Sequence, residues 1–229
     1  MRIKNDESRM TNHELRITNY ELRMTNYMKE QDINGRLYNP YIIEERQLNI
    51  TQLDVFSRLM MDRILFLSGE VVGDTMDTLV AQLLFLDSVN HDPINLYINS
   101  QGGECYSGLE LISVMKFIKS PVYTTVLGLA ASMGAVIASA GEKGHRMALP
   151  YARFMIHQPS SGIGYSTFKD QAIHLKEMES LKMDLYQVLS ENSGQTIEQI
   201  EALCDRDNWM KADEAIQLGF LDEIVERKA

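Results

Sequence analysis

Residues 94–140 read INLYINSQGGECYSGLELISVMKFIKSPVYTTVLGLAASMGAVIASA, and this stretch decides the fold. Ile94–Ile98 is an apolar run of strand length, Tyr106–Ile118 has the apolar spacing of a helix, and Val122–Leu127 is a second strand. A strand, a helix and a strand in succession imply a right-handed crossover between parallel strands. The sequence therefore predicts an α/β core.

The same alternation continues on both sides of this stretch. Further strands are predicted at Ile64–Leu67 and Arg153–Ile156, and further helices at Thr75–Asp87, Ala131–Ala140, Thr196–Leu203 and Ala212–Leu218. No Pro-, Gly- or Ser-rich linker interrupts the pattern. We therefore expect one domain over residues 39–229.

A long amphipathic helix is predicted at Ser166–Ser190. Its apolar residues recur at steps of three and four, and about 25 residues correspond to roughly 37 Å. A domain of this size cannot easily cover such a length with its own side chains. We expect part of the apolar stripe to pack against another copy of the chain; the alternative is a helix that lies across its own core.

The first residues differ from the rest. Residues 1–38 are expected to form a disordered or processed tail, in which residues 11–27 hold two and a half copies of a seven-residue repeat. A coiled coil needs three or four such heptads, so low complexity is the better interpretation. Met28 follows the repeat, which raises the hypothesis that translation starts there.

Composition and charge exclude several classes of function. The 229 residues include 22 basic and 32 acidic ones, a net charge of −10, without the basic clusters that bind nucleic acid. Cys105 and Cys204 form no CxxC pair and are too few for a disulfide framework, which favours the cytoplasm. Residues 120–141 carry no charge, but their Gly, Ser, Thr and Pro indicate a buried strand, turn and helix rather than a membrane span. No apolar segment near the N-terminus resembles a secretory signal.

Ser132 is the first candidate for chemistry. It lies in Gly128-Leu-Ala-Ala-Ser132-Met-Gly134, a strand followed by a turn of small residues into a helix. This position exposes its hydroxyl beside main-chain N–H groups that lack helical partners and can receive an oxyanion. An isolated serine at a helix start, however, more often caps the helix than attacks a substrate.

His157 and an aspartate are the next candidates. His157 follows the strand Arg153–Ile156 and precedes Pro159, so its side chain can reach a cleft at the carboxyl edge of a parallel sheet. A single histidine in such a place is more often a hydrogen-bonded structural residue than a catalytic base. In Asp205-Arg-Asp207-Asn-Trp, a predicted loop between two helices, spacing alone does not choose between the two aspartates.

Four motifs in one order are far more specific than any single residue. They are Tyr97-Ile-Asn-Ser-x-Gly-Gly103, Gly128-x-Ala-Ala-Ser132-Met-Gly134-Ala, Met155-Ile-His157-Gln-Pro159, and Asp205-Arg-Asp207-Asn-Trp-Met followed by Ala212-x-Glu-Ala-x-x-x-Gly219. Together they resemble the ClpP family, the proteolytic components of bacterial Clp proteases. The resemblance runs from about Tyr41 to Val225.

The resemblance implies a role for individual residues. Ser132 matches the family's nucleophile, His157 its general base and Asp207 the carboxylate that orients the imidazole. The backbone N–H groups of Gly103 and Met133 match its oxyanion hole, where a Cβ at position 103 is expected to block the approach of the main chain to the tetrahedral intermediate. The implied reaction is hydrolysis of peptide bonds through an acyl-enzyme.

The resemblance also implies an architecture and an assembly. Members of the family have a crotonase-like α/β fold, with repeated β-β-α units and a protruding handle helix, to which Ser166–Ser190 corresponds. They stack as two seven-membered rings around a closed chamber. Asp205 and Arg206 match an ion pair between the rings, which the resemblance makes a more plausible role for them than catalysis.

Partners follow from the same resemblance. An AAA+ unfoldase such as ClpX, ClpA or ClpC is expected to feed unfolded protein substrates into the chamber, docking in apolar clefts to which Tyr97 and Phe117 contribute. ATP is used by that partner, and this chain has no GxxxxGK[ST] loop, so we expect no nucleotide, other cofactor or metal in this subunit. Nucleic acid and membrane are not expected as partners.

Some positions depart from the family's pattern. Gln101 replaces a usual proline, Leu129 a common glutamine, and Asn95 an aromatic residue of the docking cleft. Residues 160–167 replace the usual glycine-rich segment after His-Gln-Pro and are one residue longer. Cleavage preference, contact between rings and choice of unfoldase are therefore less well determined than the Ser-His-Asp set.

Two alternatives remain. One is a specialised or catalytically silent member of the family that serves as a structural ring subunit, against which the presence of all three catalytic residue types argues. The other is a crotonase-type acyl-CoA enzyme, which shares the fold and the paired N–H groups but needs no Ser-His-Asp set. Hydrolysis of a short peptide separates these possibilities.

Overall fold

A computed structural model describes residues 41–46, 49–160, 162 and 167–226. The predicted tail at 1–38, its repeat, Met28 and most of the atypical segment 160–167 lie outside these residues. The chain divides into two units, 1–55 and 56–229. In the first, β1 (Tyr41–Arg46) and β2 (Asn49–Asp54) pair as an antiparallel hairpin. One domain over 39–229 stays a prediction.

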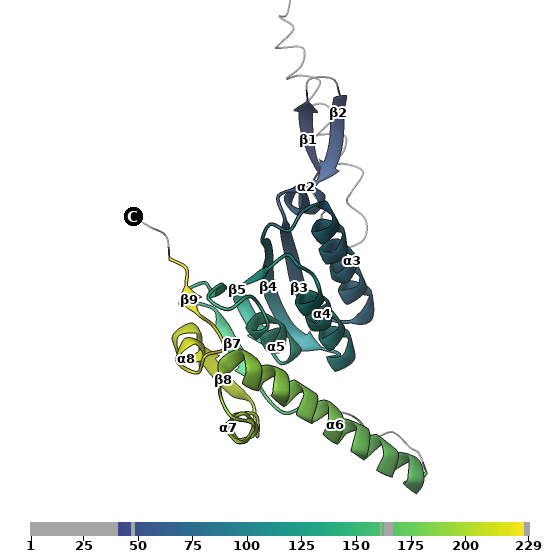
Figure 1. Ribbon diagram of the computed structural model, residues 1–229, viewed down its shortest axis with the longest axis vertical. Coiled ribbons are helices and arrows are strands. Elements are labelled where there is room, and N and C mark those ends of the chain that lie inside the picture. Colours follow the sequence, from purple (N-terminus) through teal and green to yellow (C-terminus); the bar gives the residue numbers. More distant parts are fainter. Residues whose placement is uncertain (1–40, 47–48, 161, 163–166, 227–229) are drawn as a thin grey trace, which may run out of the picture. The chain divides into compact units, whose positions relative to one another are not determined.

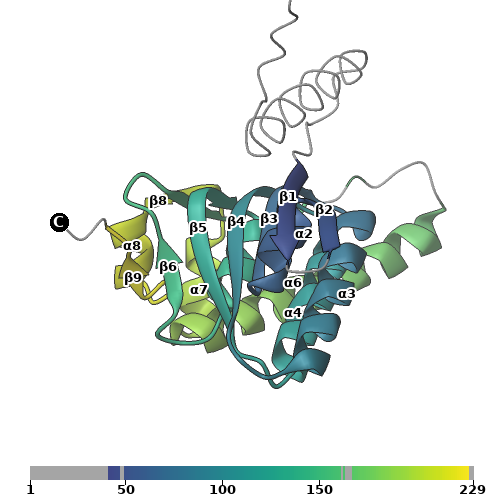
Figure 2. The same cartoon turned by 90° about the horizontal axis from the view of Figure 1, so that it is seen from above.

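The second unit is built on a sheet of seven strands. These are β3 (Ile64–Val71), β4 (Ile94–Gly103), β5 (Val122–Ala131), β6 (Arg146–Ala148), β7 (Arg153–Ile156), β8 (Asn208–Lys211) and β9 (Glu223–Ile224). Their order is β3-β4-β5-β6-β9, and β7 pairs with both β5 and β8. Figure 2 shows β3, β4, β5 and β6 side by side. All pairs are parallel except β7 with β8, which confirms the predicted α/β class.

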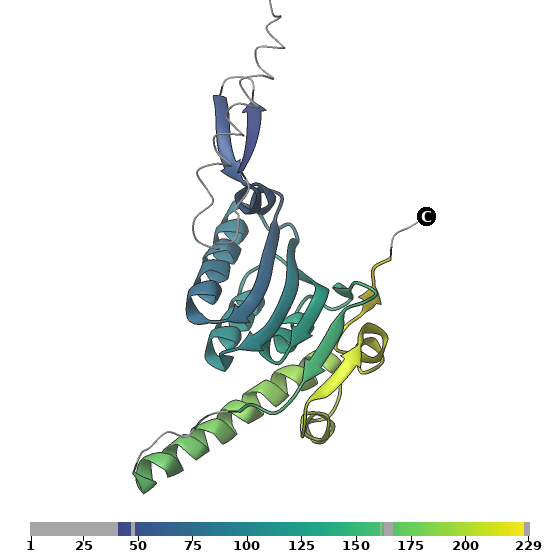
Figure 3. The same ribbon diagram turned by 180° about the vertical axis from the view of Figure 1, so that it is seen from behind.

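Helices follow most of the strands. They are α2 (Val55–Met61), α3 (Gly73–Val89), α4 (Cys105–Phe117), α5 (Met133–Ser139), α6 (Phe168–Ser193), α7 (Ile197–Leu203) and α8 (Ala212–Gln217). The opposite views of Figures 1 and 3 show α3, α4 and α5 on one face of the sheet. Because successive crossovers have the same hand, helices that link neighbouring strands in one direction lie on the same face.

The core lies between the sheet and these helices. In β4, Ile94, Leu96 and Ile98 are buried, whereas Asn95 and Tyr97 on the opposite face are only half-buried. Strand side chains alternate between the two faces, so this pattern matches a sheet covered by helices on one face. In α3 the buried residues recur at helical spacing: Met76, Leu79, Leu83 and Leu86.

Several boundaries differ from the prediction. β4 and β5 extend past their apolar runs to Gly103 and Ala131, because main-chain pairing continues through polar and small residues. The helix predicted from Ala131 begins at Met133. The segment predicted as a loop at Asp205–Trp209 turns into β8 at Asn208, which pairs with β7, about fifty residues earlier in the chain. A short strand that depends on so distant a partner has little local signal.

The long helix is confirmed as α6, which ends three residues later than predicted. Its second half is anchored in the core by Leu181, Leu185, Tyr186 and Leu189. Its first half extends away from the sheet (Figure 1), and Phe168, Ile173 and Leu175 there are exposed. Among the residues that the structure describes, no side chains therefore cover this part of the apolar stripe.

No helix in the described part of the chain combines the length and the hydrophobicity needed to cross a membrane.

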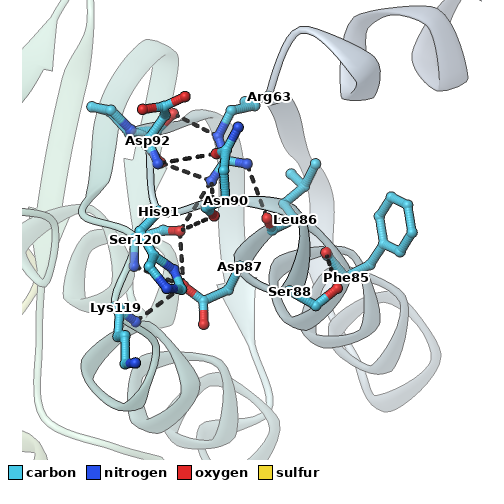
Figure 4. Close-up of polar contacts among 11 residues, drawn as sticks. Arg63, Phe85, Leu86, Asp87, Ser88, Asn90, His91, Asp92, Lys119 and Ser120 are labelled. Atoms are coloured by element: carbon cyan, nitrogen blue, oxygen red, sulfur yellow. Dashed lines mark hydrogen bonds and ion pairs between the residues drawn. The ribbon is translucent and has the colours of Figure 1, made fainter.

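Arg63 lies just before β3 and links the end of α3, the loop that follows α3 and the loop before β5 through hydrogen bonds. It has a positive φ of 61°, and its guanidinium donates to the carbonyls of Leu86 at 2.9 Å and Asp92 at 2.7 Å and to the Ser120 hydroxyl at 3.0 Å. The Ser120 hydroxyl in turn donates to the Asp87 carboxylate at 2.8 Å (Figure 4). Carbonyls at the end of α3 lack helical partners, so this network satisfies them and ties α3 to the loop before β5.

A second charged group lies inside the carboxyl-terminal part. Arg146 is only 2% exposed and donates to both carboxylate oxygens of Asp222, at 2.6 and 2.8 Å, and to the carbonyls of Asn192 and Ser139. Burial by itself raises the pKa of the Asp222 carboxyl. Hydrogen bonds from the Arg146 side chain and from the main chain of Arg146 and Gly144 outweigh burial and hold this pKa below its usual 3.8.

Replacing Asp222 with asparagine is expected to lower the free energy of unfolding by about 3 kcal/mol, because it leaves the Arg146 guanidinium buried without its counter-charge. The depressed pKa gives a stabilisation that is present above the carboxyl's unfolded pKa and lost as the pH falls through its folded pKa. Urea denaturation between pH 3 and pH 7 should therefore show a weaker acid dependence in the variant. Asp62→Asn, which breaks the exposed ion pair with Arg58, is the control and should cost about 0–1 kcal/mol. Equal losses in both variants contradict the prediction.

Candidate active site

Ser132 occupies a strained turn between β5 and α5. Its φ is 53° and its ψ is −126°, a conformation that residues other than glycine rarely adopt. The turn is held by its own main chain: the Ser132 N–H donates to the Met155 carbonyl at 2.9 Å, and the Ser132 carbonyl accepts from Ala135 and Val136. Strain of this kind persists only where surrounding contacts enforce it, and it concentrates at functional sites.

The Ser132 hydroxyl does not cap the helix. Its side chain makes no hydrogen bond to the first N–H groups of α5. It lies 2.8 Å from Nε2 of His157 instead. Of the two interpretations that the sequence allowed, the structure therefore excludes the capping serine.

The pairing of three strands brings the candidate residues together. β5 and β7 run parallel with Ala131 opposite Met155, so the residue after each strand lies at the same edge. β7 and β8 run antiparallel with Ile156 opposite Asn208. His157 and Asp207, the next residues outward, are therefore neighbours.

A continuous chain of hydrogen bonds results. Nδ1 of His157 lies 2.9 Å from Oδ1 of Asp207, and Nε2 lies 2.8 Å from Oγ of Ser132. A carboxylate only accepts, so the Nδ1–H donates to Asp207, which leaves Nε2 free to accept the serine proton. The His157 side chain is 27% exposed and the Asp207 side chain 62% exposed.

Two consecutive glycines lie beside Ser132. Gly102 has a φ of +91°, and a Cβ there would stand 2.7 Å from the Cβ of Ser132 and 2.8 Å from the N of Met133. Gly103 has a φ of +153°, and its Cβ would collide with the Val71 carbonyl. Glycine at 103 is thus required by a neighbouring strand, and the expected block of the approach to a tetrahedral intermediate stays a prediction.

Gly102 is a residue of the site that sequence reasoning missed. Because it packs against the serine turn, the following peptide, which carries the Gly103 N–H, lies next to Ser132. The Met133 N–H is the first of α5. The sequence signal that could have identified Gly102 is the pair of glycines that follows the apolar run Ile94–Ile98.

Asp205 and Arg206 directly precede Asp207 in the chain and lie on the surface. The Asp205 carbonyl accepts from Nε2 of Gln158 at 2.8 Å and from Nη1 of Arg206 at 3.2 Å. Both side chains are exposed. The structure therefore separates Asp207, which faces His157, from Asp205, which does not.

Tyr97 and Phe117, the two residues predicted to contribute to a docking cleft, have different surroundings. Tyr97 stacks on Phe66 with 5.6 Å between ring centres, whereas Phe117, at the end of α4, is 80% exposed. Among the described residues no ring contact joins the two. Their shared role in a cleft between subunits stays a prediction.

Comparison with known families agrees with the motifs. The family model described as Clp protease matches residues 46–228. This range includes every candidate residue named above.

Three curated relatives extend the comparison, and each is named an ATP-dependent Clp protease proteolytic subunit. The Bacteroides fragilis protein is 51% identical over 193 residues, 83% of this chain and 92% of its own. The Porphyromonas gingivalis protein is 46% identical over 198 residues, 85% and 88% of the two chains. The Streptococcus salivarius protein is 46% identical over 188 residues, 81% and 96%. The chain therefore belongs to the Clp protease family, the family of peptidases that its sequence motifs resemble.

Proposed function

We propose that the chain is a serine endopeptidase, the proteolytic subunit of a Clp-type barrel protease that degrades unfolded polypeptides. The observation that carries the proposal is the hydrogen-bonded chain from Asp207 through His157 to Ser132. A serine, an imidazole and a carboxylate in this order form the arrangement of a serine peptidase, whatever their order in the sequence.

In the proposed reaction, Oγ of Ser132 attacks the carbonyl carbon of the scissile bond while Nε2 of His157 accepts the serine proton. The carbonyl oxygen becomes an oxyanion that accepts hydrogen bonds from the N–H groups of Gly103 and Met133. Each donor of this kind typically contributes about 10²–10³ in rate. Asp207 holds the imidazole in the tautomer that can accept the proton.

Collapse of the tetrahedral intermediate breaks the C–N bond, and His157 passes its proton to the leaving amine. A water molecule then attacks the ester on Ser132, giving its proton to His157, which returns it to the serine oxygen. One water is consumed, and an amine and a carboxylic acid are released. The enzyme ends in its starting protonation state.

Both alternatives fit these contacts less well. A silent ring subunit has no need of a strained serine 2.8 Å from an oriented imidazole. An acyl-CoA enzyme of crotonase type has no need of any of the three residues. We therefore retain the peptidase.

A direct test measures hydrolysis of a short fluorogenic peptide together with labelling by a small fluorophosphonate, which reacts with activated serines. We expect turnover, and an adduct that mass spectrometry locates on Ser132. An unlabelled and inactive preparation that is correctly assembled favours the silent ring subunit.

We further propose that the subunits assemble as two stacked heptameric rings, with α6 as the handle and with Asp205 and Arg206 paired between the rings. The exposed apolar residues in the first half of α6 support this assembly, because they need a partner to cover them. An AAA+ unfoldase in the cytoplasm, such as ClpX, ClpA or ClpC, is the proposed source of unfolded substrate and the consumer of ATP. Tyr97 and Phe117 are proposed to contribute to its docking cleft.

Sedimentation should show species of seven or fourteen subunits. Replacing Arg206 with glutamate is expected to shift fourteen-subunit species to single rings, because it places like charges at the contact. Lys211→Glu, an equal charge reversal at an exposed position outside that contact, should leave the distribution unchanged. A wild-type protein that is monomeric at micromolar concentration contradicts the assembly.

A further inference from the structure

A small cavity opens beside the Ser132 hydroxyl and the His157 ring. Its walls are mainly apolar side chains from α4, α5, β7 and α6, among them Cys105, Val136, Ile156, Leu185, Tyr186 and Leu189. A peptide whose carbonyl carbon is attacked by Ser132 carries, on the same residue, a side chain that must be accommodated next to that serine. This cavity is the adjacent space for it.

The cavity is very small. Its volume is about 20 Å³. By the same measure the hollow lined by Phe56, Phe66 and Thr75 has about 390 Å³, so the cavity beside Ser132 is narrow. The methyl group of alanine fits, whereas a leucine or phenylalanine side chain requires the walls to move. Closely packed interiors resist such movement.

Tyr186 is the bulkiest side chain among these walls and is held firmly. It is 2% exposed in the anchored half of α6, and Nζ of Lys182 lies 5.6 Å from the centre of its ring. Burial, and then the nearby Cys204, Glu201 and Asp205, raise the pKa of the phenol to about 12. Tyr186 therefore remains an uncharged, fixed wall at neutral pH.

A second wall is fixed as well. A Cβ added to Gly108 of α4 would collide with the side chain of Met133, including its sulfur atom. Met133 thus lies closely against the backbone of α4 and cannot withdraw in that direction. Cys105, half-buried at the start of the same helix, forms part of the wall that α4 contributes.

We propose that Tyr186 and Cys105 restrict this pocket to small side chains, so that the enzyme cleaves preferentially after alanine and residues of similar size. The proposal rests on the proposed function, since it assigns the cavity to the residue that is acylated onto Ser132. A smaller side chain at position 186 should let the enzyme cleave after larger residues as well. A larger side chain at position 105 should exclude even small residues from the pocket.

The test compares the assembled wild-type protein with its variants on peptides that differ only in the residue before the scissile bond: alanine, valine, leucine or phenylalanine. We expect kcat/KM for the alanine peptide to exceed that for the leucine and phenylalanine peptides at least tenfold. Tyr186→Ala should reduce this ratio at least tenfold, while Tyr186→Phe, which keeps the ring, should retain it. Tyr151→Ala, at a highly exposed position outside the cavity, is the control and should not change the ratio.

Cys105→Leu provides a second, independent arm that does not depend on the folding of Tyr186→Ala. A leucine at this position fills the cavity, so kcat/KM for the alanine peptide should fall at least tenfold while the small fluorophosphonate still labels Ser132. Unchanged turnover of the alanine peptide in this variant overturns the assigned pocket.

The outcomes also separate the two proposals. A wild-type protein that is labelled and cleaves the leucine and phenylalanine peptides as fast as the alanine peptide overturns the size restriction and leaves the serine peptidase standing. A protein that neither reacts with the fluorophosphonate nor cleaves any of the peptides overturns the proposed function, and the pocket assignment with it.

Discussion

Replacing Ser132 with alanine is expected to lower kcat for a short peptide by about 10⁶-fold, the loss seen when the nucleophile of such a triad is removed. The Oγ atom is the group that forms the acyl-enzyme in the proposed reaction, and it lies within hydrogen-bond distance of Nε2 of His157. Binding should change far less, because the cavity and the N–H groups of Gly103 and Met133 remain. The measurement is kcat and KM for one fluorogenic peptide, together with sedimentation to verify assembly.

Ser113→Ala is the matched control for this substitution. Ser113 lies on an exposed face of α4 and donates only to the carbonyl of Leu109, one turn earlier. Its loss should leave kcat within about a factor of two, because the substitution removes a hydrogen bond within α4 and no group of the proposed site. Full activity of the Ser132→Ala protein, with no contaminating peptidase, would mean that the hydrolysis does not use this serine.

Replacing Asp207 with asparagine is expected to lower kcat by about 10³-fold, somewhat less than the roughly 10⁴ typical of a buried triad aspartate. The amide N–H of asparagine donates where the carboxylate accepted, so the imidazole proton moves from Nδ1 to Nε2. His157 then presents an N–H to Ser132 and cannot take its proton. The smaller loss is expected because the Asp207 side chain is 62% exposed, so water can partly replace the carboxylate.

The control for this substitution is Asp213→Asn, which removes an equal charge from the exposed first turn of α8. Its kcat should match that of the wild type. KM should stay nearly constant in both variants, because Asp207 is proposed to act on the base rather than on the substrate. A fall in kcat of less than tenfold in a fully assembled Asp207→Asn protein would show that His157 is oriented by other contacts.

Much of the fold could be predicted from local patterns. Apolar runs and three- and four-residue spacings correctly indicated the central strands, the helices α3 and α4, and the length of α6. Local patterns failed where pairing is long-range. β8 has no strong apolar alternation, and it forms because β7 offers its main chain from about fifty residues away.

In the candidate site, too, some features are visible in the local sequence and others depend on contacts between distant segments. Glycines at 102 and 103 and a serine at 132 are visible in the sequence, and their order is specific enough to indicate a family. The collision that forbids a side chain at Gly103 comes from Val71, thirty-two residues earlier. The spacing of residues in the sequence does not predict this contact between Gly103 and Val71.

The sequence by itself determined the α/β class, the long helix, the family and the residue types available for catalysis, because these depend on periodicity and on short motifs. Only the tertiary structure decided that the Ser132 hydroxyl turns away from its helix, that Asp207 rather than Asp205 faces His157, and that Tyr186 lines the adjacent cavity. Each of these outcomes depends on which strands and helices become neighbours. That is set by packing and register between distant segments, which a local pattern does not record.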